Sequence, residues 1–174
     1  MLTEAVRVVA DWLAHATYGV NAQLTTMPRD AGITAAASVT VYDETRHPEV
    51  ARGQVPDLLP ALLVSTSATP LTNTSNAVRP FPADSEIELG IRYAVSRAAT
   101  DQSTTDVAQL DRAVRRSLGA LFTTAAGESA RARNSVHLIS WRSYRLELYQ
   151  ANDDTHVTAA MVLTVMARDV WAAS

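Results

Sequence analysis

Apolar and polar residues in the second half of the chain alternate first at the period of a strand and then at the period of a helix. Residues 86–95 carry an apolar side chain at every odd position, which is typical of a half-buried strand. Residues 106–122 repeat their apolar side chains at helical spacing, which predicts a helix with one apolar stripe. The stripe consists of Val107, Leu110, Val114, Leu118 and Leu121. Because the apolar face of the strand must be covered, this half predicts a helix laid across a sheet.

A long strand is predicted over residues 136–149. Most of its apolar side chains fall on one side, namely Leu138, Tyr144, Leu146 and Leu148. Ile139 and Trp141 fall on the other side and break the alternation. A β-bulge near residues 140–143 would explain this switch, because one extra residue reverses the side on which the following side chains lie.

A second long strand is predicted over residues 156–170, joined to the first by a hairpin turn at residues 152–154. Its odd positions from 157 to 167 are apolar, but its other face also carries Ala160, Val162 and Met166. A strand with one face in water would be more polar than this. Either a helix of the same molecule or another subunit therefore covers the second face. Because only two strong helices are predicted, we consider a partner molecule a serious possibility.

One helix is predicted in the first half of the chain. Thr3 can cap it, Glu4 lies in its first turn, where negative charge is favourable, and Gly19 can end it after about four turns. Its apolar stripe is formed by Leu2, Val6, Val9 and Leu13.

Two strands and two connecting segments complete the first half. Residues 38–43 predict a short strand, and residues 58–66 predict a more continuously apolar and therefore more buried strand. Residues 27–32 contain proline and glycine and predict a turn. Residues 47–57 are polar and contain two prolines.

Residues 67–84 form a long segment with three prolines and hardly any apolar periodicity. Loops of this length are uncommon in compact domains. Two interpretations remain open: a hairpin arm that reaches a neighbouring molecule, with Val78 and Phe81 as its anchors, or a mobile surface loop. We predict a single domain over residues 1–174 with an α+β fold, in which two main helices pack on one face of a mixed, mostly antiparallel sheet.

Composition excludes several kinds of chemistry. The chain has 174 residues, which suffice for a core without disulfide or metal, and it contains no cysteine. It also contains no lysine, so neither Schiff-base catalysis nor a P-loop is available. The net charge of −3 predicts no general attraction to nucleic acid or to anionic membranes. Charged residues near the amino terminus and the lack of a long apolar run predict a soluble protein without a classical signal peptide.

Few residue patterns suggest a catalytic or metal site. Asp11 and His15 lie four positions apart on the first predicted helix and could share a cation, but an exposed ion pair is the commoner arrangement. The segment 127–131 contains Ser129 after a glycine, yet it lacks the second glycine of a serine-hydrolase elbow and does not follow a strand. Glu86 and Glu88 share a strand face, as carboxylates of a glycosidase can, although alternating charge is usual on the wet side of a strand.

Arginines gather on the outer face of the second predicted helix and shortly after it. They are Arg112, Arg115, Arg116, Arg131 and Arg133. Arginine suits phosphate, but acidic residues are interleaved among these arginines. A solvated face or a subunit contact is the favoured interpretation. The three tryptophans, Trp12, Trp141 and Trp171, are expected in the core or at an interface. We therefore predict no catalytic, cofactor-binding or metal site.

The order of these elements resembles that of tail terminator proteins of long-tailed bacteriophages. The resemblance rests on the first helix, on the buried strand ending at residues 62–65, on residues 86–95, on the following helix and hairpin, and on the ending at residues 167–171. It covers most of the chain, apart from residues 43–57 and 67–84.

The resemblance implies a non-enzymatic virion structural protein, assembled in the host cytoplasm and located at the junction of tail and neck. Such a subunit would form a homo-oligomeric ring, usually a hexamer, that caps the tail tube, ends its polymerisation and joins the tail to the head-side connector. Its partners would be the tail tube protein and the connector protein. Genomic DNA would pass through the negatively charged ring without specific binding.

Two alternatives remain beside this interpretation. One is a head-tail connector or another neck protein, which would also be small, non-catalytic and ring-forming. The other is a small α+β enzyme or ligand-binding domain that draws on Asp11, His15 or the group Arg112, Arg115 and Arg116.

Overall fold

A computed structural model describes residues 2–29, 36, 38–52, 60–66, 84–96, 100–132, 136–149 and 156–169. Within them the chain forms α1 (Leu2–Leu13), α2 (Val20–Thr26), β1 (Thr40–Asp43), α3 (Pro48–Ala51), β2 (Ala61–Thr66), β3 (Asp84–Ser96), α4 (Thr100–Thr123), α5 (Ala125–Arg131), β4 (Val136–Tyr149) and β5 (His156–Asp169). The predicted α+β class is confirmed. No helix among these residues is long and apolar enough to cross a membrane.

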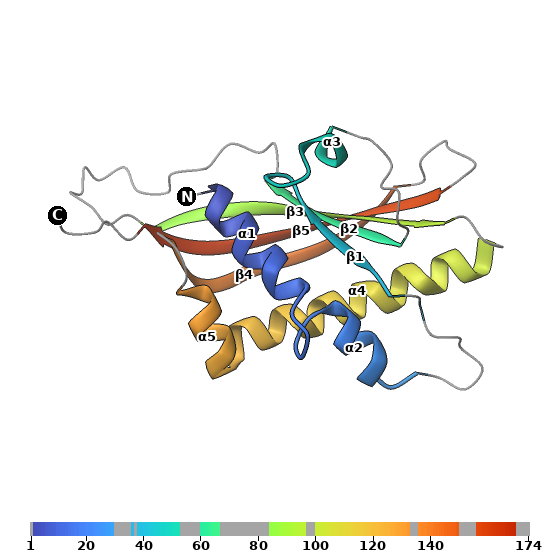
Figure 1. Ribbon diagram of the computed structural model, residues 1–174, viewed down its shortest axis with the longest axis horizontal. Coiled ribbons are helices and arrows are strands. Elements are labelled where there is room, and N and C mark those ends of the chain that lie inside the picture. Colours follow the sequence, from blue (N-terminus) through green and yellow to red (C-terminus); the bar gives the residue numbers. More distant parts are fainter. Residues whose placement is uncertain are drawn as a thin grey trace.

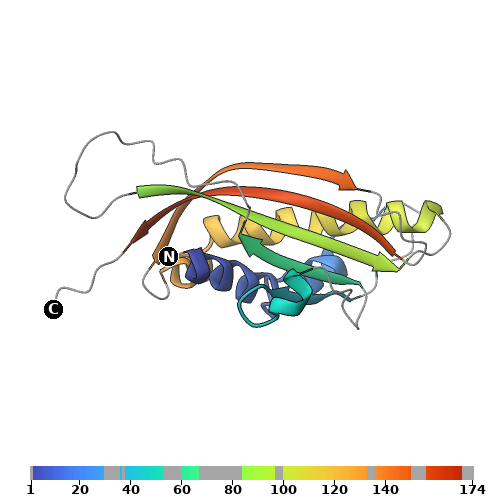
Figure 2. The same cartoon turned by 90° about the horizontal axis from the view of Figure 1, so that it is seen from above.

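The strands form one five-stranded sheet in the order β1-β2-β3-β5-β4. β1 pairs with β2 in parallel, and the other three pairs are antiparallel, so the sheet is mixed and mostly antiparallel as predicted. β1 and β4 are its two edges (Figure 1). The three long strands β3, β5 and β4 run side by side, and the shorter β2 and β1 extend the sheet beyond β3 (Figure 2).

One face of the sheet belongs to the hydrophobic core. The alternation in β3 and β5 places their odd positions on this face, where Ile87 lies opposite Val165 and Leu89 opposite Leu163, all without solvent exposure. The same core includes buried residues from four helices. They include Val6, Val9, Trp12 and Leu13 of α1, Val20 and Leu24 of α2, Leu110, Val114, Leu118 and Leu121 of α4, and Ala130 of α5. The apolar stripe predicted for residues 106–122 thus packs as expected, in a helix that begins six residues earlier and ends one residue later.

The other face of the sheet is covered differently along its width. At the β2 end, Leu63 and Ser65 are buried, and α3 contacts β1 and β2. Arg92 on the same face of β3 donates a hydrogen bond to the Ala51 carbonyl of α3 at 2.8 Å. Figure 1 shows α3 apart from the other helices. In β5 the even positions Val162 and Met166 are half-buried, and no described helix packs across them.

The predicted bulge in the first of the two long carboxyl-terminal strands is confirmed, and there are two register shifts. They lie between Leu138 and Ser140 and between Trp141 and Ser143, so that Ile139 and Arg142 have no partner across β5. Each extra residue reverses the side of the following ones. Trp141 therefore returns to the core side of the sheet, whereas Ile139 is 39% exposed.

The amino-terminal helix differs from its prediction. α1 begins at Leu2, so Thr3 lies inside the helix and not at its cap. It ends at Leu13, and Gly19 is the N-cap of a second helix, α2, that the sequence did not predict. Between the two helices, Nδ1 of His15 accepts hydrogen bonds from the backbone N–H groups of Thr17 and Tyr18. These contacts shape the turn after α1, which ends six residues before the predicted stop at Gly19.

Two other short helices were also not predicted. α3 lies in the polar segment 47–57, with Pro48 at its first turn, where proline needs no hydrogen bond partner for its nitrogen. α5 follows α4 after Thr124, whose side chain accepts a hydrogen bond from the Gly127 N–H. Residues 67–83, the hairpin turn at 152–154 and Trp171 lie outside the described residues, so the predictions made for them are not addressed by the structure.

Candidate functional site

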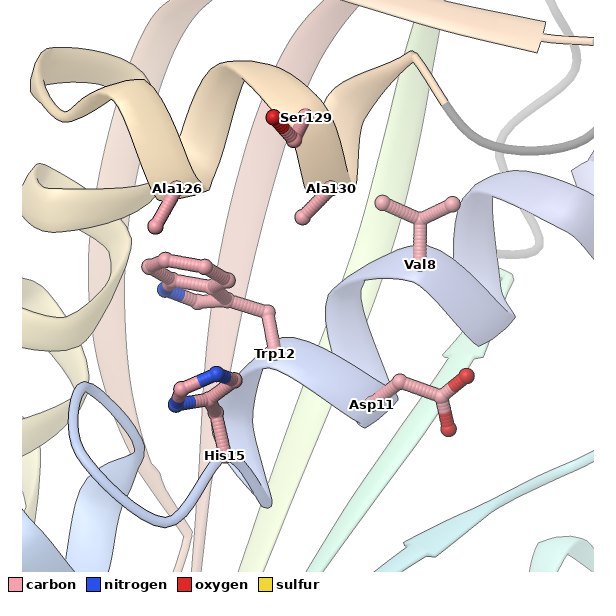
Figure 3. A pocket seen from close by; sticks show the side chains of 7 residues that line it. All are labelled: Val8, Asp11, Trp12, His15, Ala126, Ser129 and Ala130. Carbon is pink, nitrogen blue, oxygen red and sulfur yellow. The ribbon is translucent and has the colours of Figure 1, made fainter.

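The groove between α1 and α5 brings together three residues that the sequence singled out. Asp11, His15 and Ser129 all line a cavity of about 240 Å³ (Figure 3). The rest of its lining is apolar and consists of Val8, Trp12, Ala126 and Ala130. An acid, a histidine and a serine in one cavity are the components of a hydrolase site, so their geometry decides whether they can act together.

Asp11 is engaged away from the cavity. Its Oδ1 lies 2.6 Å from a guanidinium nitrogen of Arg46, which also forms an ion pair with Asp43 at 3.2 Å. Figure 3 shows the Asp11 carboxylate pointing away from His15. The expected ion pair between Asp11 and His15 is therefore wrong, because Arg46 from the turn after β1 takes the position of the cation. Sequence spacing along one helix gave no sign of this distant arginine.

His15 is held by the turn that follows α1. Its Nδ1 accepts the N–H groups of Thr17 and Tyr18 at 3.1 and 3.3 Å, and its ring centroid lies 5.3 Å from that of Trp12. Trp12 lies between His15 and Ala126 in Figure 3, and its Nε1 donates to the Ser117 carbonyl at 2.7 Å. The imidazole therefore shapes a turn and packs against the Trp12 ring at a tilt of 33°.

Ser129 lies in the middle of α5 and does not face a base. Its hydroxyl donates a hydrogen bond to the Ala125 carbonyl at 3.1 Å, within the helix. The glycine of this segment has a packing role, since a Cβ atom on Gly127 would lie only 2.2 Å from the Leu121 carbonyl oxygen. The segment 127–131 is thus a close contact between α4 and α5, and the three polar residues of the cavity do not form a catalytic set.

The arginine group on α4 is divided among several intramolecular contacts. Arg112 donates to the Pro28 carbonyl at 3.2 Å, and Arg116 donates to Oε1 of Gln23 in α2 at 3.1 Å. Arg115 forms an ion pair with Asp111 at 3.0 Å and lies over the ring of Tyr144. The three side chains are exposed, as predicted, but they connect α4 to α2 and to β4. Their use within the molecule weakens the case for a phosphate site.

A polar contact between α4 and β4 was missed by the sequence analysis. The Tyr144 hydroxyl donates to Oδ1 of Asp111 at 3.0 Å, and the Tyr144 ring packs near Trp141 at 5.9 Å between centroids. Burial raises the pKa of Tyr144 far above its usual value, and the nearby Asp111 carboxylate adds to this effect. The phenol is therefore a neutral hydrogen bond donor that ties the edge strand to the helix. The only sequence signal for this contact was the broken alternation around Trp141, which indicated that Trp141 and Tyr144 of β4 could both lie on the core side of the sheet.

Asp43, at the end of β1, is the most thoroughly buried carboxylate that the structure describes, with 2% exposure. It accepts hydrogen bonds from the Thr45 N–H, the Thr45 hydroxyl and the Arg46 N–H at 2.6 to 3.0 Å. Burial by itself raises the pKa of Asp43, but the hydrogen bonds from Thr45 and Arg46 and the Arg46 charge outweigh it and lower the pKa below its usual value. Asp43 is thus ionised and shapes the turn after β1.

The remaining acidic candidates do not assemble into a site. Glu86 and Glu88 both lie at even positions of β3, opposite Met166 and Thr164 of β5, which agrees with the alternating charge predicted for that strand. Among the described residues, no three histidine or acidic side chains gather closely enough to hold a metal ion. No protein-family model matches the sequence, and a search of curated proteins finds no match to it.

Proposed function

We propose that this chain is a non-enzymatic virion structural protein that caps the tail tube of a long-tailed bacteriophage as an oligomeric ring. In this role it ends tail polymerisation and joins the tail to the head-side connector. The proposal combines the resemblance in element order with one property of the fold, namely that no described helix packs across the part of the second sheet face around Val162 and Met166 of β5, which we call the uncovered face.

The uncovered face carries the proposal because its middle is apolar. Val162 lies opposite Gly90 in β3 and Arg145 in β4, and Met166 lies opposite Glu86 and Ser140. Both apolar side chains are half-buried. Burying the rest of such a surface stabilises an assembly by roughly 25 cal/mol for each Å² of apolar area removed from water. A ring requires two different patches that meet, and this face would supply one of them.

The residues around the cavity between α1 and α5 support a structural role over an enzymatic one. Asp11 is paired with Arg46, Nδ1 of His15 accepts backbone N–H groups, and Ser129 donates within its own helix. Each group therefore has a structural contact that accounts for its position. An enzyme would need to hold a base and a nucleophile within hydrogen-bond reach of each other.

Electron microscopy of the parent particle, with an antibody against this chain, tests the proposal directly. We expect the label at a single ring where the tail tube meets the neck. Label along the repeat of the tube, on the head side of the connector alone, or nowhere in the particle would reject the proposed function.

A variant with a charged residue on the uncovered face gives a second test. Val162→Glu should leave the chain folded but prevent its incorporation at the tail end, whereas Ala108→Glu, which places the same residue at an exposed position of α4, should incorporate normally. Normal incorporation of Val162→Glu would show that this face is not an assembly surface.

A further inference from the structure

The turn between α1 and α2 is built around His15. Its imidazole Nδ1 accepts hydrogen bonds from the backbone N–H groups of Thr17 and Tyr18 at 3.1 and 3.3 Å. Its carbonyl accepts another, from the Gly19 N–H at 2.8 Å. The turn is tight, because a Cβ atom on Gly19 would lie 2.3 Å from that carbonyl oxygen. The side chain and the backbone of one histidine therefore hold the segment that leads into α2.

These contacts fix the position of the hydrogen on the neutral His15 ring. A ring nitrogen that accepts N–H groups carries no hydrogen itself, so the hydrogen of the neutral imidazole is on Nε2. When the ring takes up a second proton, that proton binds to Nδ1 and points at the N–H groups of Thr17 and Tyr18. Both hydrogen bonds are then lost, and the N–H dipoles oppose one another.

Two aromatic rings beside His15 favour the charged imidazole, but they do not hold the turn closed. The ring centroids of Trp12 and Tyr18 lie 5.3 and 5.4 Å from that of His15, and Figure 3 shows the Trp12 ring beside it. The contact with Trp12 does not require the turn, because Trp12 belongs to α1. This leaves the contact with Tyr18 against two hydrogen bonds. A cation–π contact at an exposed site contributes about as much as one such hydrogen bond, so protonation favours the open turn.

The charged groups around His15 do not replace the lost hydrogen bonds. Asp11 of α1 lines the same cavity, but its carboxylate points away from His15 and is paired with Arg46. The α5 side chains that line this cavity carry no charge. From α4, Arg116 reaches towards α2 and donates to Gln23. Among the described side chains, none of these charged groups is bonded to the imidazole.

From this geometry we infer that the turn between α1 and α2 is an acid-sensitive switch, closed while Nδ1 of His15 is unprotonated and open once it is protonated. An unperturbed histidine takes up its proton at about pH 6.5, so the switch operates between neutral and mildly acidic solution. The opening is confined to the turn, because Val20 and Leu24 keep α2 in the core. Since His15 also lines the cavity between α1 and α5, opening changes one wall of that cavity.

The inference goes beyond the proposed function and does not depend on it, since every group involved belongs to one copy of the chain. NMR spectroscopy of the full-length chain, titrated from about pH 7.5 to about pH 5, tests it. The imidazole ¹⁵N chemical shifts should place the hydrogen of the neutral ring on Nε2. As the ring takes up its proton, the protection of the Thr17 and Tyr18 amides against solvent exchange should fall at least about tenfold, after correction for the intrinsic rate.

Two variants separate the proton from the ring. His15→Asn keeps an acceptor, because an asparagine side-chain oxygen accepts backbone N–H groups of the residues that follow it, but it takes up no proton in this range. Protection of the Thr17 and Tyr18 amides should then change by less than about twofold between about pH 7.5 and about pH 5. His15→Phe keeps an aromatic ring without an acceptor, so the same amides should lose protection about tenfold already at neutral pH.

A control variant excludes the other histidine near a helix start. His47→Gln, ahead of α3, should leave the pH response of the Thr17 and Tyr18 amides unchanged. Far-ultraviolet circular dichroism confirms that each variant is folded, and if His15→Phe does not fold, the comparison of the parent chain with His15→Asn decides alone.

Four results would overturn the inference. They are a neutral ring with its hydrogen on Nδ1, a ring that takes up no proton down to the acidic end of the titration, unchanged protection of the Thr17 and Tyr18 amides after the ring is protonated, and an equal pH response in His15→Asn. None of these results depends on whether the chain caps a tail tube, so failure here and failure of the proposed function are separate outcomes.

Discussion

Buried polar side chains at two positions carry specific connections between distant parts of the chain. Asp43 accepts three hydrogen bonds from the turn that follows β1, and Trp12 joins α1 to the Ser117 carbonyl of α4. A buried polar group whose partner is removed destabilises the folded state by about 1–3 kcal/mol. Single substitutions at these positions therefore have measurable effects.

Asp43→Asn is expected to lower the free energy of unfolding by about 1–3 kcal/mol at pH 7, because the amide cannot accept as many hydrogen bonds and carries no charge for Arg46. Urea denaturation followed by circular dichroism measures the change. Glu49→Gln, at an exposed position of α3, is the control and should change the free energy of unfolding by about 0.5 kcal/mol or less.

The same substitution predicts a pH dependence. Because the pKa of Asp43 is lowered in the folded state, its contribution is complete above the unfolded pKa of about 3.9 and disappears as the pH falls through the lower folded pKa. The stability difference between the parent chain and Asp43→Asn should therefore shrink as the pH falls from about 5 to below the folded pKa. A difference that stays constant over that range would contradict the role assigned to the carboxylate.

Trp12→Phe is expected to lower the free energy of unfolding by about 2–3 kcal/mol, because it removes both the hydrogen bond to Ser117 and part of a fully packed side chain. Trp141→Phe is the control, since Trp141 is only half-buried on the edge strand and should lose less. Urea denaturation followed by circular dichroism compares the two. An equal decrease in the free energy of unfolding for both variants would mean that the hydrogen bond from Trp12 to the Ser117 carbonyl contributes nothing to stability.

At the scale of elements, the close approach of α5 to α4 depends on one glycine. A Cβ atom on Gly127 would lie 2.2 Å from the Leu121 carbonyl oxygen, whereas one on Gly119 in α4 would meet nothing within 4 Å. Gly127→Ala should therefore lower the free energy of unfolding by more than about 2 kcal/mol. Gly119→Ala should raise it by about 0.5–1 kcal/mol, because alanine is the better helix former.

The midpoint temperatures of thermal unfolding of the two glycine variants separate packing from helix propensity. Alanine favours the helix at both positions, but only at Gly127 does its Cβ atom clash with a neighbouring helix. An equal increase in midpoint temperature for both would show that α5 can move away from α4 at no loss.

The elements that the sequence predicted well are those with long, regular patterns. The bounds of β3, β4 and β5 differ from the predicted ones by at most two residues, because a strand pattern of ten or more residues leaves little ambiguity. α2, α3 and α5 have seven, four and seven residues, too few for a helical stripe to be recognised. The chain enters these helices at Gly19, Pro48 and Thr124. Glycine, proline and threonine are also common in ordinary turns, so they do not by themselves indicate a helix.

On the scale of the whole molecule, the two faces of the sheet should respond differently to charge. Leu163 points into the core with no exposure, and its neighbour Val162 lies half-buried on the other face. Leu163→Glu should lower the free energy of unfolding by more than about 4 kcal/mol, because it buries an unpaired charge. Val162→Glu should lower it by about 1 kcal/mol or less in the isolated chain, since Arg145 lies opposite on β4.

Urea denaturation of the two variants measures this contrast. A large loss for Val162→Glu in the isolated chain would mean that another part of the same molecule covers this face. The assembly proposed for the chain would then lose its physical basis, because the apolar part of this face would already be covered within the chain.

The sequence by itself determined the strands, the long helix and the faces they bury, because hydrophobic periodicity is a local property that each segment carries alone. The tertiary structure decided which polar groups meet. Arg46 pairs with Asp11 from 35 positions away, Arg116 reaches Gln23 from 93 positions away, and Ser129 joins His15 in one cavity without contacting it as a partner. Such contacts depend on how the helices are placed on the sheet, and no spacing along the chain encodes that placement.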